Sequence, residues 1–260
     1  MARFPIDNAL LREPNLWVPG KKPVGNVKID WGHPLADGIE MYLPMDSKMD
    51  HDLVTYNRIT STPNAQDRVT ETVGRKGKQL TSRNDAAEGW IYSMPANITF
   101  TSNEYIVFAA VCKANTSGSP WSTLFRLNHA GAIGFFIYLP NDANATNTVD
   151  IYYDGNLGPV ADANYVDDEW HLYLMQMPCN TSNQSCEFYR DGALFSTDVS
   201  YNTTSILHTY NEIDILNNSE WPEESYIGDC AGMWFWKGAK WDSLKVKEFS
   251  DDPYQFLIPS

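Results

Sequence analysis

The run that decides the fold is EYIVFAAVC, residues 104–112, the most apolar stretch of the chain. Successive side chains point to opposite faces of a strand, so an uninterrupted apolar run predicts a central strand that is covered on both faces. Shorter runs follow at residues 122–127, 134–139 and 149–153, and turn residues separate them. A spacing of about ten residues between short strands is typical of an antiparallel β-sandwich.

The rest of the chain fits the same interpretation. Further strands are predicted at residues 39–44, 170–177, 187–195, 212–216 and 232–237. The second and third of these would form a hairpin around a polar loop. Only residues 243–249 suggest a short helical turn, because no long stretch keeps an apolar period of 3.6 residues. We therefore expect an all-β fold with few helices.

Composition supports one large domain with a substantial core. The chain has 260 residues, of which 43% are hydrophobic and 13% aromatic, including 9 Trp and 14 Tyr. A β-sandwich of this length folds as a single unit. Aromatic and β-branched side chains suit a pleated, half-buried surface, so the aromatic content agrees with the strand pattern.

Charge and hydropathy exclude other classes. A net charge of −14 and a pI of about 4.6 would repel nucleic acid. No apolar segment reaches the roughly 18 residues of a membrane-spanning helix. Residues 1–15 carry charges and lack the apolar core of a secretory signal. We expect the protein to stay in the cytoplasm where it is made, or to leave it by assembly or lysis.

Composition also divides the chain into three parts. Residues 1–36 are rich in Pro and Gly and predict an extended N-terminal arm, which either packs on its own domain or docks onto a neighbour. Residues 37–250 form the sandwich, and residues 251–260 form a C-terminal tail. Apolar side chains of the arm and tail would be buried against partner surfaces. The candidate docking residues are Phe4, Leu16, Trp17, Trp31, Tyr254 and Phe256.

Four cysteines occur, and none forms a C-x-x-C pair of the kind that zinc sites use. Cys179 and Cys186 flank the polar run of residues 180–185. If that run is a hairpin loop, the two thiols face each other and a disulfide is one possibility. The alternative is a pair of reduced thiols in a reducing compartment.

Five landmarks, in order, resemble the laminin-G-like, concanavalin A-like jelly-roll family. They lie at residues 38–43, 74–80, 168–172, 187–192 and 227–236, and the resemblance covers about residues 38 to 250. It implies a jelly roll. Relatives often hold one calcium ion through oxygen ligands at the rim of the sandwich, so calcium is a cofactor the resemblance leaves open, with no ligand matched residue by residue.

The two ends of the chain resemble something narrower. Residues 15–25 and 252–259 are similar to the flanks of laminin-G-like proteins in tailed-bacteriophage virions. This resemblance implies a non-enzymatic structural protein of the virion, assembled in the host cytoplasm. It would decorate the capsid or form part of a tail or fibre, with the major capsid or tail protein as partner, and would form homo-oligomers.

Catalysis requires a separate test, because this fold class includes glycosidases. Their strand motif places acids two residues apart on one face. Glu212 and Asp214 match the first two acids, but the third position is Leu216, or Asn217 if the strand bulges, and neither is a general acid. We therefore interpret Glu212 and Asp214 as solvent-facing strand residues and expect no enzyme activity.

An alternative function is a lectin-like module that binds cell-surface glycan. Trp221 lies in an acidic loop and is the candidate glycan contact, because sugar rings stack on aromatic side chains. The simpler interpretation is that Trp221 closes one end of the core. The two functions are compatible, since a decoration protein can also bind glycan.

Overall fold

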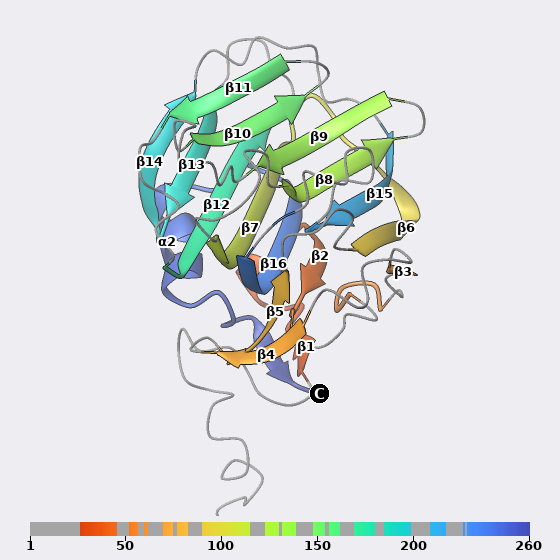
Figure 1. The fold of residues 1–260 in the computed structure, drawn as a ribbon, viewed down its shortest axis with the longest axis vertical. Coiled ribbons are helices and arrows are strands. Elements are labelled where there is room, and N and C mark those ends of the chain that lie inside the picture. Colours follow the sequence, from red (N-terminus) through yellow and green to blue (C-terminus); the bar gives the residue numbers. More distant parts are fainter. Residues whose placement is uncertain are drawn as a thin grey trace, which may run out of the picture.

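The described part of the chain consists almost entirely of antiparallel strands. The computed structural model describes residues 27–45, 52–56, 60–61, 70–74, 77–82, 90–114, 123–129, 132–138, 148–153, 156–161, 169–179, 185–198, 209–216, 226 and 228–260. Two sheets of these strands pack face to face (Figure 1). The all-β sandwich expected from the sequence is confirmed.

The first sheet has seven strands. Their order is β11 (Asn156–Ala161), β10 (Thr148–Tyr153), β9 (Ala132–Tyr138), β8 (Thr123–His129), β15 (Thr209–Ile215), β6 (Trp90–Thr99) and β3 (Thr60–Ser61). All of these pairings are antiparallel. The pair β8 and β15 lies near the middle of the sheet, and the candidate functional site is built on it.

The second sheet has eight strands. Seven follow the order β14 (Ala193–Asp198), β13 (Cys186–Arg190), β12 (His171–Pro178), β7 (Tyr105–Ala114), β16 (Gly228–Gly238), β5 (Gly77–Ser82) and β4 (Thr70–Gly74). The eighth, β2 (Ile39–Leu43), pairs with β16. The apolar run 104–112 forms most of β7, which pairs with β12 on one side and β16 on the other.

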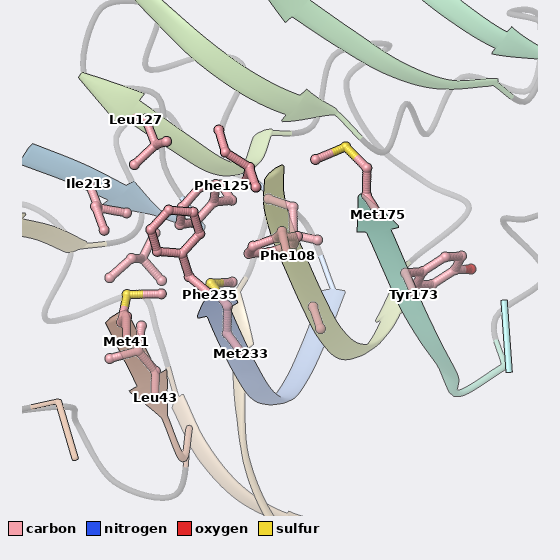
Figure 2. Packing of buried hydrophobic residues seen from close by; sticks show 14 of the residues in the cluster. Met41, Leu43, Phe108, Phe125, Leu127, Tyr173, Met175, Ile213, Met233 and Phe235 are labelled. Atoms are coloured by element: carbon pink, nitrogen blue, oxygen red, sulfur yellow. The ribbon is translucent and has the colours of Figure 1, made fainter. Parts of the chain in front are cut away.

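The core between the two sheets, here called the inner core, is mostly aromatic and sulfur-containing. Figure 2 shows side chains of both sheets pointing toward one another. The ring of Phe125 lies 4.5 Å from that of Phe108 and 5.7 Å from that of Phe235, measured between centroids. Aromatic pairs at this spacing contribute beyond the area they bury.

A second apolar cluster, here called the outer core, covers the other face of the eight-stranded sheet. It contains Trp234 and Trp236 of β16 together with Val107, Ala109 and Val111 of β7. Because the alternate residues of β7 belong to the inner core, this strand is covered on both faces, as the sequence indicates.

Three segments near the chain ends supply the cover of the outer core. They are residues 27–36 with the 3₁₀ helix η1 (Pro34–Ala36), the helix α2 (Ser243–Asp251), and the C-terminal residues 252–259. Strand β1 (Val27–Ile29) pairs with β17 (Leu257–Pro259), and the indole Nε1 of Trp236 donates to the carbonyl of Leu35 at 2.7 Å. The helical turn expected at residues 243–249 is confirmed as α2.

This cover bears on the expected N-terminal arm. Residues 27–36 pack on their own domain, which is one of the two alternatives expected for the arm, because Leu35 and Ala36 are buried in the outer core. The segment 251–260 is likewise part of this layer through β17. Residues 1–26 lie outside the described residues, so an arm formed by them stays a prediction.

The four cysteines are thiols. Cys112, Cys179, Cys186 and Cys230 are buried and form no disulfide, so the expected alternative of reduced thiols is the one observed. Burial raises the pKa of the Cys179 thiol to about 12. Cys112 and Cys230, not considered as a pair from sequence, lie directly opposite each other on β7 and β16.

Candidate functional site

The candidate site is a group of four polar side chains on the outer face of the seven-stranded sheet. The register of β8 and β15 places Asn128 opposite Glu212 and Arg126 opposite Asp214. Neighbouring residues on both strands, such as Leu127 and Ile213, belong to the inner core. Strand alternation therefore directs the four side chains to the opposite face. We call Arg126, Asn128, Glu212 and Asp214 the polar quartet.

Two members of the quartet form a buried ion pair. Arg126 Nη1 lies 3.8 Å from Asp214 Oδ2, and the two side chains are 5% and 0% exposed. Removing both charges from water costs free energy that their mutual attraction offsets. The expectation that Asp214 faces solvent is therefore wrong. Its partner lies on another strand, far away in the sequence, and no local pattern indicates that pairing.

The other two members are joined by a hydrogen bond. Asn128 Nδ2 donates to Glu212 Oε1 at 3.1 Å, and Glu212 is half-buried rather than fully solvent-facing as expected. The carbonyl oxygen Oδ1 of Asn128 is buried, and no described residue donates a hydrogen bond to it. This end of the quartet therefore holds two acceptor groups, the half-buried carboxylate of Glu212 and the buried amide carbonyl of Asn128.

The third position of the glycosidase motif is either Leu216 or Asn217, and Asn217 lies outside the described residues. The register on both sides of β15 is regular from Glu212 to Ile215, but Ile215 and Leu216 both belong to the inner core, so the strand alternation ends at Ile215. Leu216 follows with a φ of 54° and is buried in the inner core. A leucine cannot donate a proton, which agrees with the sequence argument, while the absence of enzyme activity stays a prediction.

The other candidate residues fall into three groups. Trp31 is 61% exposed, so its docking role stays a prediction. Tyr254 and Phe256 are buried against Trp234 and Tyr42 of the same chain, which corrects their assignment as partner-docking residues, because neither presents a surface to a partner. The remaining candidates lie outside the described residues: Phe4, Leu16, Trp17 and Trp221.

Metal binding gains no support within the described part of the chain. No group of three or more His, Cys, Asp or Glu gathers there. Asp52 is fully buried and accepts hydrogen bonds from the backbone nitrogens of Tyr42, Val54 and Thr55, so its carboxylate holds residues 52–56 onto β2. Calcium at the sandwich rim stays a prediction. None of the helices described is long and apolar enough to cross a membrane.

A second polar network lies on the eight-stranded sheet and has a different environment. Gln176 donates to Glu187 Oε2 at 2.7 Å and to the carbonyl of Trp241 at 3.1 Å, while the Trp241 backbone nitrogen donates to Gln176 Oε1 at 2.9 Å. Every hydrogen-bonding group of the Gln176 side chain is thus used within the chain. This network joins the sheet to the segment leading into α2.

Electrostatics show that Glu187 is held by this network. Burial alone would raise the pKa of Glu187, but hydrogen bonds from Lys240, Tyr189 and Gln176 outweigh it and lower the pKa below its ordinary value. Burial and the hydrogen bond to Glu187 raise the pKa of Tyr189 to about 12. The sequence analysis missed this network, although the single amide within the apolar strand 171–178 was a signal for it.

The fold defines a class, the antiparallel β-sandwich, whose solved counterparts include a domain in complex with arabinotriose and a receptor-binding domain of botulinum neurotoxin D. No protein-family model and no curated protein match the chain. Among solved structures, it is similar to domain 4 of AbnA, a GH43 extracellular arabinanase from Geobacillus stearothermophilus, in complex with arabinotriose. That match has a TM-score of 0.59 and 14% identity, and covers 82% of this chain and 98% of the domain.

Toxin binding domains are also similar. The binding domain of botulinum neurotoxin serotype G matches with a TM-score of 0.56 and 12% identity, over 81% of this chain and 50% of that one. The serotype D ligand-binding domain in complex with N-acetylneuraminic acid has a TM-score of 0.56 and 10% identity, over 82% and 50%. The chain thus spans half the length of the toxin binding domains. At these identities, the likeness shows the fold.

Proposed function

We propose that this chain is a non-catalytic carbohydrate-binding domain whose ligand face is the outer face of the seven-stranded sheet. The observation that carries the proposal is the polar quartet. It places hydrogen-bonding side chains on this face, whereas the corresponding face of the other sheet is sealed by the outer core. Binding sites for polar ligands use a small number of placed polar groups on a formed scaffold.

The similar structures support this choice of ligand class. One is a domain solved with arabinotriose, and another was solved with N-acetylneuraminic acid. Neither candidate for the third position of the glycosidase motif, Leu216 or Asn217, is a general acid, which supports binding without cleavage. The lectin-like alternative considered from the sequence therefore becomes the leading function.

A structural role in a phage virion is the second candidate. The resemblance of residues 15–25 and 252–259 to virion-protein flanks is its source. The pairing of β1 with β17 supports it, because Val27 and Pro259 lie opposite each other and would give the domain a single point of attachment. On such a protein, the end at β1 and β17 would bind the capsid or tail protein, and the glycan-binding face would be exposed on the virion surface. Light scattering of the full chain tests the homo-oligomer that this role implies.

Binding of the full chain to a glycan array, followed by calorimetry on the strongest ligand, tests the leading function. We expect specific binding that Glu212→Ala abolishes. The matched control is Glu248→Ala, an exposed glutamate of α2 on the other side of the molecule, which should bind normally. Absence of binding to any glycan, or equal loss in both variants, would contradict the proposal.

A further inference from the structure

We infer that the polar quartet selects an uncharged, hydroxyl-rich sugar over an acidic one. This inference rests on the proposed function and deepens it by naming the ligand class. The solved structures leave both possibilities, since arabinotriose is neutral and N-acetylneuraminic acid carries a carboxylate. The contacts within the quartet distinguish them.

The single cation of the quartet is already neutralised. An acidic sugar is bound most strongly by charge-assisted hydrogen bonds, above all from an arginine fork. Here Arg126 lies across from Asp214, at 3.8 Å, and both side chains are almost completely buried. Because the carboxylate of Asp214 offsets the guanidinium charge, Arg126 does not supply the net positive charge that a carboxylate ligand needs.

At the Glu212 end of the quartet, the hydrogen-bonding groups left for a ligand are acceptors, whereas the buried donor Arg126 Nε lies at the other end, beside Asp214. Asn128 donates through Nδ2 to Glu212, so the amide presents its carbonyl Oδ1, which is buried and receives no hydrogen bond from any described residue. An ionised carboxylate such as that of Glu212 also only accepts. A buried acceptor without a donor costs about 1–3 kcal/mol. A sugar hydroxyl can donate to both groups, whereas a sugar carboxylate cannot.

Charge acts in the same direction. The quartet holds one cation and two carboxylates, and the chain as a whole carries a net charge of −14. The field of such a surface repels an anion and leaves a neutral ligand unaffected. Donor-acceptor matching and charge thus both favour the neutral sugar.

Calorimetry with paired oligosaccharides tests the inference. Each pair differs only by a terminal N-acetylneuraminic acid, and the full chain is used. We expect the neutral member to bind at least about tenfold more tightly, equivalent to about 1.4 kcal/mol. Glu212→Gln exchanges a carboxylate oxygen for a donor. It should therefore lower the affinity for the neutral oligosaccharide and reduce the ratio between the affinities for the neutral and the sialylated member.

Glu248→Gln is the matched control, since it removes the same charge from an exposed position on α2. Preference for the sialylated member would overturn the inference and leave the proposed function standing, whereas absence of all glycan binding would overturn the proposed function itself. A neutral preference that Glu212→Gln leaves unchanged, or that Glu248→Gln changes equally, would overturn the assignment to the quartet. Circular dichroism of each variant separates loss of binding from loss of fold.

Discussion

The outer faces of the two sheets differ in polarity: one is covered by apolar side chains and the other carries polar ones. On the eight-stranded sheet, Trp234 and Trp236 lie under a layer of chain-end segments, and Trp234 stacks on Tyr42 with ring centroids 5.2 Å apart. On the seven-stranded sheet, the equivalent face carries an ion pair and an amide–carboxylate pair. Burial of aromatic surface stabilises the fold without discriminating ligands, while polar groups discriminate at a cost in stability. The difference shows that one face serves packing, and it agrees with the proposal that the other face binds a ligand.

The largest effect should come from the packed face. Trp234→Ala removes a fully buried indole that contacts Tyr42, Phe249 and Tyr254. We expect the free energy of unfolding to fall by about 3–5 kcal/mol, because truncation of a large aromatic in a core leaves a cavity. Urea denaturation measures the loss. If the packed face serves stability alone, glycan affinity of the remaining folded protein should not change.

On the polar face, Asp214→Asn should lower the free energy of unfolding by about 3–5 kcal/mol at most, because it leaves the buried charge of Arg126 uncompensated. Replacing both partners, as in Arg126→Met with Asp214→Leu, should recover most of that loss. Denaturation of Arg126→Met, Asp214→Leu and the double variant forms a cycle that measures the coupling. Additive losses would show that the two charges do not interact.

A smaller effect is expected at the helix that covers the outer core. Asp242 is the N-cap of α2, and its Oδ1 accepts from the Lys245 backbone nitrogen at 2.8 Å. Asp242→Ala should cost about 1 kcal/mol of stability, the usual loss for a removed N-cap. Thermal unfolding gives the value. A neutral result would mean that packing of Val246 and Phe249 alone holds the helix.

The smallest effect concerns acid stability. The pKa of Glu187 is lower in the folded protein than in the unfolded chain. The ionised carboxylate therefore adds to the free energy of unfolding above the unfolded pKa, and this addition is lost as the pH falls through the folded pKa. We expect Glu187→Gln to be less stable than the parent at neutral pH, with the difference shrinking below about pH 4, the ordinary range of a glutamate. Denaturation midpoints between neutral and acid pH test this. A difference that does not depend on pH would assign the effect to packing.

Local patterns predicted the strands well and the surfaces poorly. The apolar run 104–112 became β7. The single strand expected at 187–195 is instead two strands, β13 and β14, separated by a turn at Asp191 and Gly192, whose φ values of 52° and 81° suit a two-residue hairpin. Strand β11 was missed because its sequence, NLGPVA, contains Gly and Pro, which are rare inside strands.

Long-range pairing explains the remaining errors. Asp214 looked solvent-facing because nothing near it in sequence indicates Arg126. Tyr254 and Phe256 looked like docking residues because apolar side chains at a chain end have no local partner. Only the pairing of β17 with β1 places their segment on the outer core. Sequence periodicity reports which face of a strand is apolar, but not which distant segment will cover it.

The pairing of β1 with β17 also has a mechanical consequence. Val27 lies opposite Pro259 and Ile29 opposite Leu257, so the outward-leading ends of both strands sit at the same end of a short antiparallel ladder. Hydrogen bonds of such a ladder run perpendicular to the strands. A force that separates the two ends would therefore load these bonds one after another, as in a zipper, rather than together in shear. This ladder would peel open at low tension and uncover the edge of the outer core before the sandwich itself yields.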